Sequence, residues 1–302
     1  MNTGRFRTLA KKYPIVRAAL YPAIFVRESF LKNKLLLQQE VTRNFGELLF
    51  DDPVIRVKEF DGIFVIDARS DLLSRIIIHK NYEPHLAKCC LQYLDKNRDV
   101  IDVGANIGFF TVMFAKNIIN KKVLSIEPTR NAIKRLHRNV ELNKVMERVD
   151  IFKGVASNQN GTMEIKTIDG KEEYSSLGKM KHPAVLEEKY TTESVTSITI
   201  DELVKQKSLD PGFIKIDVEG AEHLVFEGAQ NVLESQRPII LSELSNILLN
   251  ENGSSSNTVI NLIKKYEYDV FDPIDPSVQP GRKDYGDILC FPKELNITMN
   301  VK

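Results

Sequence analysis

The 302-residue sequence contains few cysteines, little glycine or proline, and no tryptophan. Its three cysteines, Cys89, Cys90 and Cys290, are too few for a disulfide framework and lack the paired spacing of a common zinc site. The 15 glycines and 12 prolines exclude collagen-like and low-complexity chains. With 42% hydrophobic and 27% charged residues, the composition is typical of an ordinary globular protein. We expect one large core in a reducing, cytoplasmic compartment.

Long hydrophobic runs are also missing. The longest apolar stretch near the start, residues 18–26, is interrupted by Pro22 and falls short of the roughly 20 residues that a membrane span needs. A basic segment precedes it, as in a secretory signal, but no small-residue cleavage site follows. The sequence therefore predicts neither a membrane span nor a secreted protein.

The charge of the chain is concentrated near its start. Residues 1–45 contain nine basic and two acidic residues, a net charge of +7, whereas the whole chain carries +1. This basic arm predicts two short amphipathic helices, which either pack on the body or contact an anionic membrane surface or substrate. The remaining chain is mildly acidic, which argues against nucleic acid as a partner.

The rest of the chain divides into a lead-in, residues 46–98, and a larger domain, residues 99–302. The lead-in predicts short strands followed by a helix at residues 82–94. In the larger domain, apolar runs alternate with helical patterns at residues 129–143 and 222–235, which predicts an α/β fold with a parallel sheet and helices on both faces. Residues 160–200 fit this alternation poorly, and we expect them to leave the sheet as a flap. The expected strands are residues 100–103, 123–126, 149–155, 213–218 and 239–244, with two last strands at 268–271 and 288–291.

The most informative motif is DVGANIG, residues 102–108, directly after the first of these strands and before a helix. Gly104 and Gly108 lack a Cβ atom, so the backbone can turn tightly and approach a ligand. A loop of this kind at the carboxyl edge of an open α/β sheet binds nucleotides. The alternative is that the two glycines form a simple turn.

The residues around this loop indicate which nucleotide it binds. The third glycine of the dinucleotide fingerprint is absent, and the carboxylate of Asp102 would repel a diphosphate but suits an amine or a sulfonium. Glu127 lies 19 residues after Gly108, where an acid accepts hydrogen bonds from ribose hydroxyls. Together these features predict S-adenosylmethionine as the cofactor.

The sequence resembles the FkbM-type methyltransferases in VIDVGANIGFFT (100–111), SIEPTRNAIKRLHRNV (125–140), Ser-Ser-Leu (175–177), SITIDEL (197–203), FIKIDVEGAEHLVFEGA (213–229) and PIILSEL (238–244). The resemblance implies a Rossmann-like, seven-stranded methyltransferase sheet. It also implies O-methyl transfer to a hydroxyl-bearing acceptor, such as a sugar of a glycan or glycolipid or a secondary metabolite.

The cofactor site follows from the loop and the strand ends beside it. Small apolar residues at the end of the third strand, Val155 and Ala156, leave room for the flat adenine. The expected cofactor-binding residues are Asp102, Gly104, Ala105, Asn106, Gly108, Thr111, Glu127, Pro128, Val155 and Ala156.

A second group of acids follows the fourth and fifth strands. Asp217, Glu219 and Glu243 are expected at one sheet edge, where like charges raise each other's pKa unless a cation or a proton neutralises them. They could hold Mg²⁺ or another divalent metal, or one of them could be the general base. Glu222, at a helix start, is interpreted instead as a cap.

Three further candidates lie in the flap. His182 is a candidate base with a pKa near neutrality, and Ser175 and Ser176 are candidates for orienting the cofactor or the substrate. The alternative function is a non-catalytic module that binds an adenosine ligand on the same fold. The sequence leaves the oligomeric state open.

Overall fold

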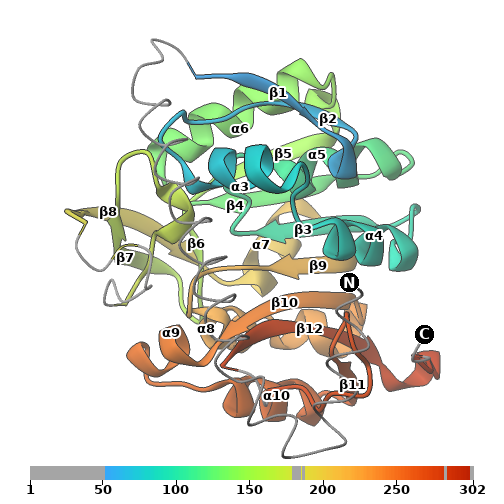
Figure 1. Cartoon of the computed structure of the whole chain (residues 1–302). Coiled ribbons are helices and arrows are strands. Elements are labelled where there is room, and N and C mark those ends of the chain that lie inside the picture. The colour runs from blue at the N-terminus through green and yellow to red at the C-terminus, as the bar shows by residue number, and fades with distance from the viewer. Residues whose placement is uncertain (1–51, 179–184, 186–187, 282–283, 300–302) are drawn as a thin grey trace, which may run out of the picture. The chain divides into compact units, whose positions relative to one another are not determined.

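A seven-stranded mixed sheet forms the centre of the protein (Figure 1). The structure, a computed structural model, describes residues 52–178, 185, 188–281 and 284–299. The basic arm and His182 lie outside the described residues. The strand order is β11-β12-β10-β9-β3-β4-β5. Their bounds are β3 Asp99–Val103, β4 Val123–Glu127, β5 Val149–Lys153, β9 Pro211–Ile216, β10 Ile239–Ser245, β11 Tyr268–Phe271 and β12 Tyr285–Pro292.

Five neighbouring strands, from β10 to β5, run parallel. Every residue of β3, β4 and β9 is buried, as expected for strands that helices cover on both faces. From β3 the chain proceeds to β4 on one side, and the later strand β9 returns to the other side. The sheet order therefore reverses between β3 and β9, and such a reversal opens a crevice at the carboxyl ends of the strands.

The sheet is not parallel throughout. The five strands of the alternating region are parallel as predicted, whereas no direction was predicted for the last two. Strand β12 lies between β10 and β11 and runs antiparallel to both. The described residues between β11 and β12 form no helix. A parallel connection needs a crossover, whereas a direct return joins antiparallel strands. The predicted number of seven strands is confirmed.

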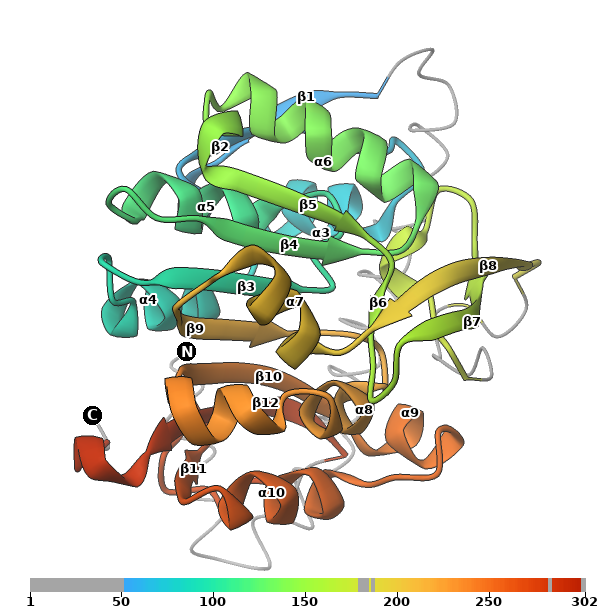
Figure 2. The same ribbon diagram turned by 180° about the vertical axis from the view of Figure 1, so that it is seen from behind.

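Helices cover both faces of the sheet (Figures 1 and 2). Two separate apolar clusters lie under them, one around Phe60, Phe110 and Phe114 and the other around Phe226 and Ile263. The predicted helix 222–235 is instead two elements, α8 (Glu222–Glu227) and the π-helix η5 (Val232–Gln236). Between them, Gly228 packs so closely that a Cβ there would lie 2.0 Å from the carbonyl oxygen of Ser157. The α-helices are α3 Asp71–His79, α4 Pro84–Tyr93, α5 Phe109–Asn117, α6 Arg130–Leu142, α7 Ile200–Lys207, α8 Glu222–Glu227, α9 Asn246–Glu251 and α10 Ser256–Lys265.

The predicted β-rich lead-in is a hairpin of β1 (Val54–Val57) and β2 (Gly62–Val65), joined by the 3-10 helix η1 (Lys58–Phe60). Side-chain amides of α6 pair with the free edge of β2. Asn139 accepts a hydrogen bond from Val65 N at 2.7 Å and donates to Val65 O at 3.2 Å. Asn143 bonds Ile63 N and O in the same way, at 3.0 and 2.7 Å. The amides thus satisfy backbone groups that a neighbouring strand would otherwise pair.

The flap begins where the expected strand 149–155 breaks. Strand β5 ends at Lys153, and β6 (Val155–Ala156) joins β8 (Thr191–Ile198) and β7 (Gly161–Thr167) in a separate three-stranded sheet (Figure 2). A Cβ at Gly154 would lie 2.4 Å from Thr196 O, so only glycine permits this bend.

None of the described helices is long and apolar enough to span a membrane.

Candidate active site

A cavity of about 1180 Å³, counting the part that is open to solvent, lies at the carboxyl ends of the parallel strands, where the sheet order reverses. Its walls come from the glycine loop after β3, the end of β4, the segment after β9, and β10. Helix α3, the flap and β12 close the remaining sides. Among the residues expected in the site, the cavity wall includes Gly104, Ala105, Asn106, Glu127, Pro128, Val155, Ala156, Ser175, Asp217, Glu219 and Glu243.

The glycine loop approaches the segment after β9 more closely than any side chain would allow. Gly104 has φ +76°, and a Cβ there would lie 1.8 Å from the carbonyl oxygen of Asp217. Gly108 has φ +90°, and a Cβ there would lie 2.4 Å from Leu136, on α6. Gly104 is therefore needed to form the cavity wall, whereas Gly108, behind the wall, is needed to start α5.

Glu127 fixes the loop and also faces the cavity. Its Oε2 accepts a hydrogen bond from Asn106 N at 2.9 Å, and its Oε1 accepts from Thr129 N and Oγ1 at 2.9 and 2.7 Å. Burial raises the pKa of this carboxyl, while the hydrogen bonds from Thr129 and Asn106 lower it. Oε1 already accepts two hydrogen bonds, whereas Oε2 accepts one and retains a lone pair, so the carboxylate can accept a hydroxyl hydrogen from a ligand.

Asp102 does not reach the cavity in this structure. It is 0% exposed, and its Oδ2 accepts a hydrogen bond from Thr111 Oγ1 at 2.6 Å. Its Oδ1 has no partner among the described residues. Asp102, Gly108 and Thr111 thus lie behind the wall, where the hydrogen bond between Thr111 and Asp102 joins α5 to β3.

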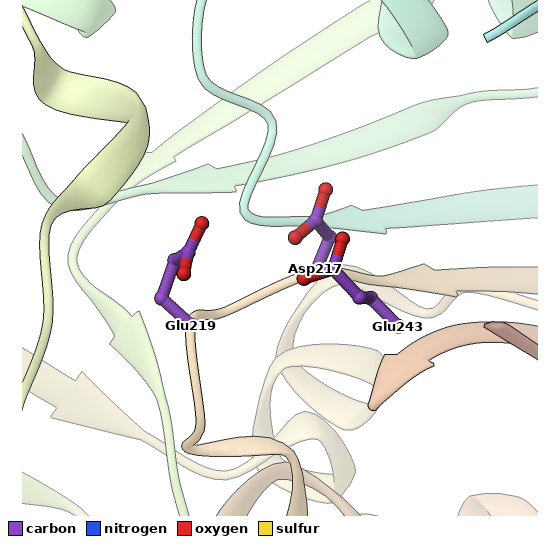
Figure 3. A group of neighbouring side chains, drawn as sticks. All are labelled: Asp217, Glu219 and Glu243. Carbon is purple, nitrogen blue, oxygen red and sulfur yellow. The ribbon is translucent and has the colours of Figure 1, made fainter. Parts of the chain in front are cut away.

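The three other predicted acids come together, as Figure 3 shows. One carboxylate oxygen from each of Asp217, Glu219 and Glu243 lies within 4.8 Å of the others. Burial raises the pKa of Glu219 and of Glu243 well above the ordinary value, and the charge of Asp217 raises both further. Tyr285 donates its hydroxyl hydrogen to Glu243 Oε2 at 2.7 Å. This acid cluster can take up protons in the range where ordinary carboxylates stay ionised.

Lys215 also lines the cavity, and the sequence analysis did not predict it as a site residue. Its side chain is 8% exposed, its Nζ donates to Asp217 Oδ2 at 3.0 Å, and the same atom lies 4.9 Å from the centre of the Phe110 ring. Burial lowers its pKa, but Asp217, Asp102 and Glu83 outweigh that effect and raise it. A lysine inside the apolar strand β9 was the available signal, because a buried charge requires a partner.

Contrary to the interpretation from the sequence, Glu222 does not cap the helix N-terminus but binds the turn before the helix. Its Oε1 accepts hydrogen bonds from Gly220 N at 3.1 Å and Val218 N at 3.3 Å, and it does not line the cavity. Burial is the largest cause that raises its pKa to about 7.

The two flap serines differ in position. Ser175 lines the cavity, and its buried Oγ has no partner among the described residues. Ser176 lies behind it, and its Oγ donates to Glu219 O at 3.4 Å.

The sequence matches the methyltransferase FkbM domain over residues 102–270, more than half of the chain. The chain belongs to the FkbM methyltransferase family. A comparison with curated proteins finds no match. The FkbM domain of this chain thus includes the glycine loop, Glu127, the flap and the acid cluster.

The FkbM chain is also similar to solved structures. One is precorrin-6y C5,15-methyltransferase from Geobacter metallireducens, with 10% identity and a TM-score of 0.41 over 70% of this chain and 88% of that one. Another is M. jannaschii TYW2 in complex with AdoMet, with 15% identity and a TM-score of 0.39 over 79% and 84%. A putative rRNA-methylase from Clostridium thermocellum has 12% identity and a TM-score of 0.40 over 67% and 89%.

Several cavity residues lie outside the matched FkbM domain and were not predicted. They come from α3, from the segment before α4 and from β12, and no sequence motif marks them. These cavity residues outside the match are Leu72, Arg75, Tyr82, Glu83 and Tyr285. Tyr174 lies within the match, in the flap, and was also not predicted because no motif marks it.

Proposed function

We propose that this FkbM methyltransferase uses S-adenosylmethionine to methylate a hydroxyl group of a sugar, or of a small polyhydroxyl metabolite. The observation that carries the proposal is one cavity with two different ends. The loop end presents backbone and Glu127, whose carboxylate is hydrogen-bonded to the loop, whereas the other end presents the acid cluster.

The loop end fits the cofactor. Val155, Ala156 and Pro128 form a small apolar wall for the adenine, and Glu127 lies beside them for the ribose hydroxyls. Main chain at Gly104 to Asn106 faces the amino-acid tail. The buried, unpartnered Oγ of Ser175 is a further polar group on this wall that a bound ligand would satisfy.

When bound, S-adenosylmethionine supplies an electrophilic methyl group on a sulfonium. The acceptor hydroxyl must lose its proton as it attacks, so a positioned base is needed. Glu219 and Glu243 have raised pKa values and face the same space, which supports one of them as that base. Lys215 holds Asp217 beside them. Alignment of the two reactants in the closed cavity supplies a further part of the rate.

A divalent metal such as Mg²⁺ is the alternative use of the acid cluster, because three carboxylates within 4.8 Å can hold such an ion. A bound metal would lower the pKa of the acceptor hydroxyl. Transfer that is lost with a chelator and restored by Mg²⁺ would support the metal, and unchanged transfer would support a carboxylate base.

The acidic lining also bears on the acceptor. Carboxylates accept hydrogen bonds from hydroxyl groups, and Tyr82, Tyr174 and Tyr285 add aromatic surface to the same cavity. The cluster would repel a phosphate backbone, which argues against nucleic acid as the acceptor. The basic arm either packs on the body or contacts an anionic membrane surface. Sedimentation with anionic liposomes of the full chain and of a chain starting at Gly46 tests this, and equal sedimentation of the two would exclude the membrane contact.

Calorimetry with S-adenosylhomocysteine tests the cofactor assignment. The wild-type chain should bind it, and Glu127→Ala should weaken binding by about tenfold or more, since hydrogen bonds to a charged group are lost. Glu141→Ala removes an exposed carboxylate on α6 and serves as the control. Equal affinity of Glu127→Ala and the wild type would refute the assignment.

Turnover distinguishes the enzyme from a module that only binds an adenosine ligand. The wild-type chain, given labelled cofactor and a panel of glycans, lipids and small alcohols, should label a hydroxyl-bearing compound. Binding of S-adenosylhomocysteine without any labelled product would favour the binding module.

A further inference from the structure

Arg75 occupies an unusual position for an arginine. It lies on α3 and shares with Leu72, one turn earlier, the face that lines the cavity. Its side chain is half-buried. The arginine therefore points into the space that the proposed function assigns to the two substrates.

The guanidinium of Arg75 has little to bind in the protein. Within the described part of the chain, its hydrogen bond is from Nη2 to the hydroxyl of Tyr174, at 3.3 Å, and it forms no ion pair with a carboxylate. A guanidinium carries five N–H donors, so most of them remain for a ligand or water. Other half-buried arginines differ in this respect: Arg98, Arg135 and Arg237 each pair with at least one carboxylate.

The acid cluster interacts with Arg75 only at longer range. Arg75 lowers the pKa of Glu219, but no carboxylate oxygen of the described residues lies within ion-pair distance of its guanidinium. Glu173, the next acid on the flap, directs Oε1 to Ser70 Oγ and Asp71 N at 2.8 and 2.9 Å. A cation held in a cavity wall without a paired anion favours a ligand that brings one.

We propose that Arg75 is the carboxylate-binding residue of this cavity. The planar fork of an arginine matches the two oxygens of a carboxylate, which a lysine cannot reproduce. The inference rests on the proposed function, which offers two sources of a carboxylate: the amino-acid tail of S-adenosylmethionine, or an acidic group on the acceptor. In either case, Arg75 selects a substrate and does not take part in proton transfer.

Two pairs of probes distinguish these sources by calorimetry. S-adenosylhomocysteine carries the amino-acid tail, and 5′-methylthioadenosine is the matching thioether without it. D-glucuronate carries an acidic group, and D-glucose is its neutral counterpart; both are titrated with S-adenosylhomocysteine at saturation. The variants are Arg75→Met and Arg75→Lys, with Arg98→Met as the control, because Arg98 binds Asp210 and does not line the cavity.

If Arg75 binds the cofactor tail, Arg75→Met should weaken S-adenosylhomocysteine binding by about 10- to 100-fold and leave 5′-methylthioadenosine unchanged. If it binds the acceptor, both adenosine probes should be unchanged, and Arg75→Met should lose the glucuronate binding of the wild type while glucose binding stays the same. Arg75→Lys should recover part of the lost affinity in either case, and Arg98→Met should behave as the wild type.

Two results would overturn the inference. In one, Arg75→Met weakens S-adenosylhomocysteine and 5′-methylthioadenosine equally, which is the result of a structural defect. In the other, it changes neither probe pair. Failure of the wild-type chain to bind S-adenosylhomocysteine would instead refute the proposed function itself, so the two failures are distinct.

Discussion

The carboxylates at the two ends of the cavity have different partners. At the loop end, Glu127 accepts three hydrogen bonds from Asn106 and Thr129. At the other end, Glu219 and Glu243 lie close to each other and to Asp217. Among the described residues, Tyr285 donates a hydrogen bond to Glu243 and Lys215 donates one to Asp217. Donors favour the charged form of an acid, whereas neighbouring acids favour the protonated form. The first end is thus suited to binding and the second to proton transfer.

The largest effect that would sharpen this comparison is expected from Asp217→Asn. The substitution removes the charge that raises the pKa of Glu219 and Glu243 and that holds Lys215. We expect the rate of methyl transfer to fall about 100- to 10,000-fold, the range of general acid-base catalysis. Affinity for S-adenosylhomocysteine should change by less than about threefold, or about 0.7 kcal/mol. A parallel loss of cofactor affinity would break the comparison, because both ends would then depend on one carboxylate.

A second effect concerns Glu222, which supports the turn beside the acid cluster and is 1% exposed. Its folded-state pKa of about 7 exceeds the ordinary 4.5, so the folded chain binds more protons between these values. The free energy of unfolding should therefore fall as pH rises from about 4.5 to 7, by on the order of 3 kcal/mol from this group. Glu222→Gln keeps an acceptor for Gly220 N and should remove that share of the slope.

Urea unfolding of the wild type and Glu222→Gln at several pH values between 5 and 8 measures this difference. Glu227→Gln, on the same helix, removes a carboxylate that binds Asn158 at the surface and is the control. Identical slopes for the wild type and Glu222→Gln would show that the group is ionised in the fold.

A smaller effect is expected at the loop end from Asn139→Asp. Asn139 is 0% exposed, and its amide donates both to Val65 O and, at 2.8 Å, to Ile107 O inside the glycine loop. Loss of the donor to Ile107 should weaken S-adenosylhomocysteine binding by about fivefold. Asn143→Asp is the matched control, since Asn143 bonds the same hairpin but not the loop. Equal affinities of the two variants, measured where both are folded, would limit Asn139 to a structural role.

Much of the fold could be predicted because local sequence patterns determine where its strands and helices lie. Buried parallel strands are continuous apolar runs, and the glycine loop and Glu127 follow strand ends directly, so sequence spacing places them at one edge. The antiparallel direction of β12 could not be predicted, since a short apolar run in the sequence does not indicate which way its strand runs in the sheet. The break at Gly154 depends on Thr196, a residue 42 positions away in the sequence.

The site was predicted less completely, for physical reasons. Asp102 was expected to contact the cofactor, but side chains alternate along a strand, and Asp102 points with Val100 toward the face that α5 covers. Lys215 was treated as part of an apolar run. Arg75 and Tyr285 approach the cavity only through tertiary packing, so spacing in the sequence does not indicate them.

The origin of the cavity wall has a consequence for substrate choice. The FkbM domain supplies the loop, Glu127 and the acids, while Arg75, Tyr82 and Tyr285 come from segments on either side of it. Under the proposed function, the residues that carry the chemistry and several that shape the cavity therefore come from different stretches of the chain. Membership of the family alone thus does not identify the molecule that becomes methylated.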